Sequence, residues 1–165
     1  MRAAVISTEG EVVARQQAPY QPDTFIPDLA ALVSILREAG EIECVGLAVP
    51  GLVNRDADRV LLSTGMPSFV GPDLHAELTN AIGTKLELEN DANAAAYGEF
   101  KAGAARDARD FFYIYIGDNV GGAFILNGHL WTGASGCAGE IGHTMINPDG
   151  IQCECGNIGC LETVA

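Results

Sequence analysis

Apolar and polar residues alternate in two short segments near the start of the chain, residues 3–7 and 11–16. This period of two, with a polar Thr-Glu-Gly turn between the segments, predicts a β-hairpin that needs a larger sheet to join. Over residues 25–36 the apolar spacing changes to three and four, which is typical of a helix with one buried face. Gly40 lies just beyond this segment, where a helix commonly ends.

The alternation of element types continues through the middle of the chain. Residues 44–49, closed by a Pro-Gly pair, are a short apolar run that predicts a buried strand, and residues 86–89 predict another strand. Apolar residues at helical spacing over 74–82, opened by Pro72-Asp73, predict a second helix, and an Ala-rich run over 92–102 predicts a third. Strands that alternate with helices in this way predict an α/β sheet with parallel strand pairs.

The pattern changes after a connector at residues 105–110. Residues 111–116 and 123–126 predict two strands, and the Asn-Gly pair that follows them is a hairpin turn signal. Beyond that turn the chain is rich in glycine and has no periodicity. We therefore expect two subdomains, a first α/β unit over residues 1–104 and the start of a second over residues 105–165.

Composition narrows the class of protein. The chain has 165 residues, of which 48% are hydrophobic and 19% are charged, values typical of a globular protein with a core of its own. It contains no apolar run of the roughly 20 residues that span a membrane. No basic and then apolar leader opens it, so we expect a cytoplasmic protein.

Charge bears on the partners of this segment. The formal net charge is −13, and the nine lysines and arginines are scattered along the chain. We therefore expect this segment to contact neither nucleic acid nor an anionic membrane surface. If the protein regulates transcription, its DNA-binding part lies outside this segment.

Three of the five cysteines cluster in the sequence Cys153-Glu-Cys155-Gly-Asn-Ile-Gly-Cys160, which follows His143 by ten residues. Zinc prefers four nitrogen and sulfur ligands in a tetrahedron, and one imidazole with three thiolates supplies that set. The two glycines allow the short loop to curl around one point. Because four protein ligands leave no open position, we expect a structural zinc ion. The alternative is buried free thiols beside an unrelated histidine.

Three other residues are expected to serve packing alone. Cys44 falls within a predicted buried strand, and Cys137 reads as a small filler in the glycine-rich segment. Trp131 is expected to pack where the two subdomains meet, although stacking on a sugar ring is an alternative for an aromatic side chain.

Asp91 lies in the sequence Glu-Asn-Asp-Ala-Asn, where a predicted strand turns into a predicted helix. A carboxylate at such a junction can face the carboxyl end of the sheet, where ligands of α/β folds bind, and take a proton from a sugar hydroxyl. The alternative is that Asp91 only caps the helix. Glu140 and His143, in a glycine-flanked turn, could both bond to sugar hydroxyls. A surface glutamate and a metal-bound histidine explain that pair equally well.

Four segments together resemble the ROK family of repressors and sugar kinases: Ala48-Val-Pro-Gly, Glu89-Asn-Asp-Ala-Asn, Gly139-Glu-Ile-Gly-His, and the cysteine segment through Leu161-Glu. The cysteine segment is the most specific of the four. The resemblance implies a partial actin-like (ribonuclease-H-like) sugar kinase fold, an α/β fold with two subdomains around a cleft and a structural zinc loop. The family's sugar contacts correspond to Asn90, Asp91, Glu140, His143 and Glu162, and its catalytic base corresponds to Asp91.

The resemblance also gives His143 two expected tasks, since one ring nitrogen would ligate zinc while the other reaches the sugar. The chain departs from the family pattern in two places. The kinases open with a strand that ends in Asp-x-Gly-Gly-Thr, whereas this chain looks like a fragment that begins after that turn and stops before the closing helices.

The second departure lies in the phosphate loop that the kinases build from Gly-Thr-Gly-x-Gly-Gly-Gly. The corresponding candidates for nucleotide contact here are Gly117, Asp118, Asn119, Gly121 and Gly122. A carboxylate replaces a hydroxyl, so Asp118 would face the negative charge of a nucleotide unless it held Mg²⁺. A similar Asp-x-Asn-Val-Gly stretch occurs in the glucose and N-acetylglucosamine repressors of the family.

These observations predict the sugar-binding core of a ROK protein, acting as the effector-sensing module of a transcriptional regulator. The alternative is an ATP-dependent hexose kinase, of the glucose, fructose or N-acetylhexosamine type, with Asp91 as general base and with ATP and Mg²⁺ as cofactors. A zinc-stabilised interaction domain without a ligand is a third possibility. The resemblance further implies a homo-oligomer, and the sequence does not identify the sugar.

Overall fold

The computed structural model describes residues 1–54, 58–71 and 73–165. Pro72, the predicted opener of the second helix, lies outside the described residues. The chain begins with the antiparallel hairpin of β1 (Arg2–Ile6) and β2 (Val12–Gln17). Next come α1 (Phe25–Leu36) and β3 (Cys44–Val49), followed by β4 (Leu52–Asn54) and β5 (Arg59–Leu62), which pair antiparallel.

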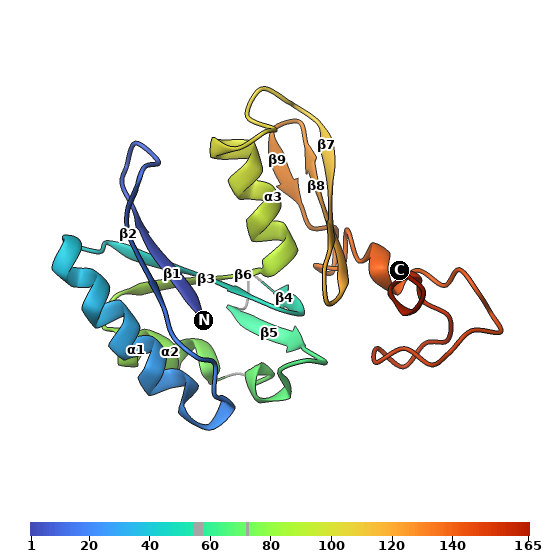
Figure 1. Ribbon diagram of the computed structural model, residues 1–165, viewed down its shortest axis with the longest axis horizontal. Helices are drawn as coiled ribbons and strands as arrows, with labels where there is room; N and C mark the ends of the chain where they lie inside the picture. The colour runs from blue at the N-terminus through green and yellow to red at the C-terminus, as the bar shows by residue number, and fades with distance from the viewer. Residues whose placement is uncertain (55–57, 72) are drawn as a thin grey trace.

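The parallel strand pair that the sequence predicts is formed by β3 and β6 (Lys85–Asn90), with α2 (Leu74–Ile82) between them in sequence. Helix α1 packs against α2, β1 and β2, and α2 packs against β6, so the two helices form one layer beneath both sheets (Figure 1). Leu78 of α2 and Val49 of β3, both almost fully buried, lie in the core between this helical layer and the sheets.

Helix α3 (Asp91–Ala102) follows β6 directly and joins the two halves of the molecule. It contacts β6 on one side and the antiparallel sheet of β7 (Phe111–Ile116), β8 (Val120–Leu126) and β9 (His129–Trp131) on the other (Figure 1). Ala96 has no exposed surface, because small side chains let the helix and β8 approach closely.

Residues from 132 to the end contain only short 3₁₀ turns, as the absence of periodicity predicts. The turn Ile141–His143 lies against β8. A Cβ at Gly142 would collide with the carbonyl oxygen of Val120, so a glycine is required for this close approach. Within the described residues, no helix has both the length and the apolar character needed to cross a bilayer.

The structure differs from the sequence-based predictions in the arrangement of the sheets and in the burial of Cys44 and Cys137. The described strands form four separate small sheets, and β3 with β6 is the only parallel pair among them. Strands β4, β5 and β9 were not predicted, because three or four residues are too few to show a period. Cys44 is exposed, since it lies on the face of β3 that points away from the core, and Cys137 is exposed in a turn.

Candidate functional site

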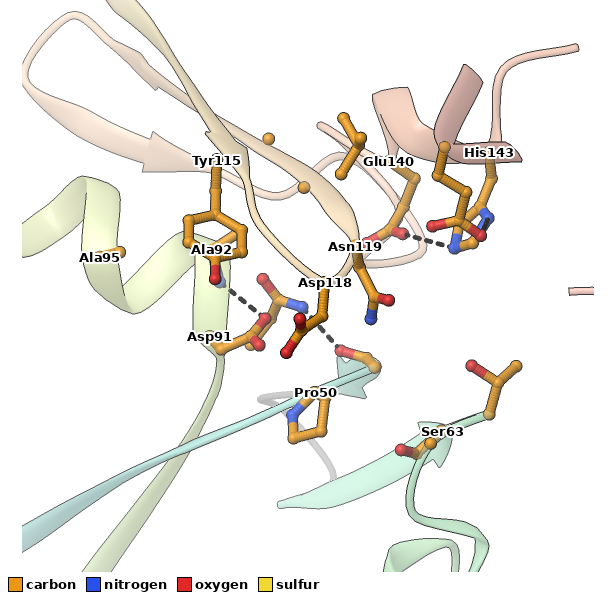
Figure 2. A pocket seen from close by; sticks show the side chains of 18 of the residues that line it. Pro50, Ser63, Asp91, Ala92, Ala95, Tyr115, Asp118, Asn119, Glu140 and His143 are labelled. Atoms are coloured by element: carbon orange, nitrogen blue, oxygen red, sulfur yellow. Dashed lines mark hydrogen bonds and ion pairs between the residues drawn. The ribbon is translucent and has the colours of Figure 1, made fainter. Parts of the chain in front are cut away.

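A cavity of about 460 Å³ lies where the carboxyl ends of β3 and β6 face the turn between β7 and β8 (Figure 2). The parallel register pairs Val49 with Asn90, so the turns that follow both strands reach the same edge. The lining residues are Pro50, Gly51, Ser63, Thr64, Gly65, Asn90, Asp91, Ala92, Ala95, Tyr113, Tyr115, Asp118, Asn119, Val120, Gly121, Gly122, Glu140, His143, Glu154 and Glu162.

Asn90, rather than Asp91, is the N-cap of α3. Its side-chain oxygen accepts a hydrogen bond from the backbone of Asn93 at 3.0 Å. Its amide nitrogen donates to the carbonyl oxygen of Gly51 at 2.9 Å, which ties the turn after β3 to the start of α3. The alternative that Asp91 only caps the helix is therefore wrong, because Asn90 is the cap. Asp91 is the first residue of the helix.

The carboxylate of Asp91 faces the cavity (Figure 2) and accepts a hydrogen bond from the backbone of Ala92 at 2.8 Å. Partial burial raises the pKa of Asp91 above its usual value, against the opposing effect of the backbone hydrogen bonds. A carboxylate with a raised pKa is a better proton acceptor than a solvated one. Its position thus suits contact with a ligand hydroxyl.

The raised pKa predicts that Asp91→Asn stabilises the fold. Above the raised pKa, the charged carboxylate carries the full cost of burial, which the amide does not carry. Melting temperatures measured over a pH series should therefore be higher for Asp91→Asn, and the gap should close as the pH falls through the raised pKa towards the ordinary value of 3.8. Asp107→Asn, an exposed control, should show no gap. A lower melting temperature for Asp91→Asn at neutral pH would contradict the prediction.

Glu140, His143 and Glu162 lie on the opposite side of the cavity, in the C-terminal segment. The Nε2 atom of His143 is 3.9 Å from a carboxylate oxygen of Glu140, and its Nδ1 atom is 3.2 Å from an oxygen of Glu162. Burial raises the pKa of Glu140, His143 opposes that rise, and the charges of Asp91 and Glu162 add to it. The two walls of the cavity therefore influence each other electrostatically.

The sulfur atoms of Cys153, Cys155 and Cys160 and a ring nitrogen of His143 lie within 4.8 Å of one another. A tetrahedral zinc ion, with Zn–S of about 2.3 Å and Zn–N of about 2.05 Å, separates neighbouring sulfurs by about 3.8 Å and sulfur from nitrogen by about 3.6 Å. The Sγ atoms of Cys155 and Cys160 are 3.7 Å apart, and Cys153 Sγ is 3.6 Å from His143 Nδ1. These four side chains fit the ligand set of one zinc ion.

The chemistry of the thiols agrees with this geometry. Burial, with a smaller contribution from Glu162, raises the pKa of Cys153 to about 12. The Cys153 thiol donates to Glu162 at 2.9 Å. A buried thiol of this kind loses its proton only when a cation compensates the charge. The loop itself depends on Gly159, at φ +64°, where a Cβ would collide with the carbonyl oxygen of Asn147.

Of the predicted nucleotide-contact residues, three lie in the turn between β7 and β8, and Gly121 and Gly122 follow in β8. Asp118, Asn119, Gly121 and Gly122 line the cavity, whereas Gly117 is not among the lining residues. Asp118 and Asn119 point towards the wall that carries Asp91 (Figure 2).

Several lining residues were not predicted from the sequence, among them Tyr113, Tyr115, Ser63, Thr64 and Glu154. The two tyrosines could have been found, because residues two apart in a strand share a face.

Comparison with known proteins adds a decisive observation. The sequence profile of the ROK family matches residues 1–165. The chain belongs to the ROK family. It is 34% identical to a glucokinase of Streptomyces coelicolor in an alignment of 165 positions that covers 99% of this chain and 52% of the relative. The crystal structure of a ROK family glucokinase from Streptomyces griseus, in complex with glucose and AMPPNP, superposes with a TM-score of 0.91 at 31% identity, over 99% of this chain and 53% of that one.

ROK relatives include regulators as well as kinases. The chain is 38% identical to the xylose repressor of Bacillus subtilis over 121 residues, or 73% of this chain and 31% of the repressor. The chain thus spans about half of the glucokinase and less of the repressor. Its fold is that of the ROK sugar kinases, and its relatives have sugar-related functions in both branches.

Proposed function

We propose that this chain is the sugar-binding core of a ROK protein and serves as the effector-sensing module of a transcriptional regulator. The observation that carries the proposal is the composition of the cavity. Asp91, Glu140 and His143 offer hydrogen-bonding groups on its walls, as a sugar with many hydroxyls requires. No lysine or arginine is among its described lining residues, and Asp118 adds a carboxylate to them, which disfavours a phosphate donor.

In this proposal the zinc loop is structural. Zinc, held by His143, Cys153, Cys155 and Cys160, would supply a fixed tetrahedral link between distant parts of an irregular segment. The Nδ1 atom of His143 faces Cys153, while Nε2 faces Glu140, so the imidazole lies between the cysteine cluster and the cavity. Zinc ligation through Nδ1 would then fix the orientation of the ring, and Nε2 would be held in position for contact with the sugar.

A hexose kinase is the second candidate, and the position of Asp91 favours it. A carboxylate at the start of α3 with a raised pKa is a reasonable general base for a sugar hydroxyl, which a sensor does not need. ATP would supply the phosphoryl group, and Mg²⁺ held near Asp118 would offset the charge of the phosphates. The named glucokinase relatives support this candidate. In either case we propose a cytoplasmic homo-oligomer.

The sugar site is tested by thermal shift. Glucose, N-acetylglucosamine or another hexose should raise the melting temperature of the protein when present at about 100 times its dissociation constant, where mass action contributes about 2.7 kcal/mol. Glu140→Ala should abolish the shift without loss of bound zinc, since Glu140 is not one of the four clustered ligands. Glu38→Ala, at an exposed position in another part of the fold, is the matched control. A shift that survives Glu140→Ala would place the sugar elsewhere.

A further inference from the structure

One wall of the cavity carries side chains that the proposed monosaccharide contacts leave unused. Tyr115, on β7, and Asp118, in the following turn, point towards Asp91, and Asn119 lines the cavity beside Asp118 (Figure 2). Tyr115 is 49% exposed. Among the described residues, no side-chain hydrogen bond or ion pair to protein is found for Asp118 or Asn119. These groups are therefore available to a ligand.

The charge of the cavity limits what that ligand can be. Five carboxylates line it, from Asp91, Asp118, Glu140, Glu154 and Glu162, and no lysine or arginine is among the described lining residues. Bringing a phosphate or a carboxylate ligand into this field costs electrostatic energy that no nearby cation offsets. A neutral ligand with many hydroxyl groups avoids that cost, because carboxylates and the amide of Asn119 accept hydrogen bonds from hydroxyls.

The size of the cavity also exceeds one ring. At about 460 Å³ the cavity falls within the roughly 300–1,000 Å³ of pockets that bury drug-sized ligands, which have more atoms than one hexose ring. A single ring therefore leaves part of this space empty. An aromatic ring such as that of Tyr115 offers an apolar face with a polar tip, and the C–H face of a sugar can pack on it.

We propose that the cavity takes a neutral disaccharide. One hexose ring would lie among Asp91, Glu140 and His143, and the second would pack on Tyr115 with its hydroxyls bonded by the side chains of the β7–β8 turn. This inference rests on the proposed sugar-binding function and names its ligand class. The half of the cavity where a phosphoryl donor would have to lie then belongs to the second sugar ring.

Isothermal titration of the zinc-loaded protein with glucose, maltose, cellobiose and sucrose tests the proposal. At least one disaccharide should bind about tenfold more tightly than glucose, which corresponds to about 1.4 kcal/mol. Tyr115→Ala and Asp118→Asn should each reduce this preference about fivefold or more. The matched controls are Tyr97→Ala, an exposed tyrosine on α3, and Asp107→Asn, and both should retain the preference.

The outcomes distinguish a failure of the disaccharide proposal from a failure of the proposed function. Glucose binding with no preferred disaccharide overturns the disaccharide proposal and leaves the sugar-binding function intact. A preference that is unchanged in both Tyr115→Ala and Asp118→Asn overturns the placement of the second ring. Absence of binding by every sugar, with AMPPNP and Mg²⁺ as a further probe, overturns the proposed function together with this inference.

Discussion

Cys155→Ser should remove the bound metal and lower the melting temperature of the protein. Purified protein is expected to hold about one zinc ion per chain, and structural zinc contributes about 10–16 kcal/mol in small domains that fold around it. Here α1, α2 and the core around Leu78 do not depend on the cysteine loop. We therefore expect residues 139–162 to become locally disordered while the rest remains folded.

Elemental analysis and hydrogen exchange measure this result. Cys137→Ser, at an exposed cysteine outside the cluster, is the matched control and should retain the metal and the melting temperature. Exchange should rise within residues 139–162 of Cys155→Ser and stay unchanged in α1 and α2. Wild-type protein that contains no zinc, or that holds Cys155 and Cys160 in a disulfide, would refute the zinc proposal.

The second large effect concerns phosphoryl transfer, which we expect to be undetectable with any hexose. Transfer requires an acceptor placed in line, a base, and donors or Mg²⁺ around the γ-phosphate. Asp91 is a plausible base, but the turn between β7 and β8 presents Asp118 and Asn119, and no arginine or lysine is among the described lining residues. Positioning and charge stabilisation provide most of the catalysis in such enzymes, so little rate should remain.

An assay of sugar-dependent ADP release decides between the sensor and the kinase. We expect the background rate. Sugar-dependent turnover on the order of 1 s⁻¹ or more, present in the wild type and lost in Asp91→Asn, would show that the kinase candidate is correct. The disaccharides named above should be included as acceptors beside the hexoses.

The elements that were predictable are those with enough residues to show a period. Helix α1 repeats its apolar spacing over three turns, and the strand β6 before Asp91 alternates leucine with polar residues. By contrast, β4 and β5 pair only three or four residues each, and their partners are fixed by tertiary contacts that no local pattern reports. The division of the sheets also depends on long-range pairing, so the sequence could not show it.

The same distinction holds for the candidate site. The cysteine segment was predictable because its ligand types and spacing are rare outside metal sites. The roles of Asn90 and Asp91 could not be separated from sequence, since either residue can cap a helix and only the structure places the cap on Asn90. Tyr115 was missed for another reason, because an aromatic residue in a strand is most simply explained by packing.

If zinc and a sugar both bind as proposed, the position of the His143 imidazole makes their two binding equilibria depend on each other. Its ring lies between the cysteine cluster and the cavity, with one nitrogen turned to each. When one ligand has immobilised the ring, binding of the other ligand costs less conformational entropy of the side chain. By thermodynamic reciprocity, a sugar that binds more tightly in the presence of zinc must raise the affinity for zinc by the same factor. A chelator would then act as an antagonist of the sugar, and the sugar would protect the protein against the chelator.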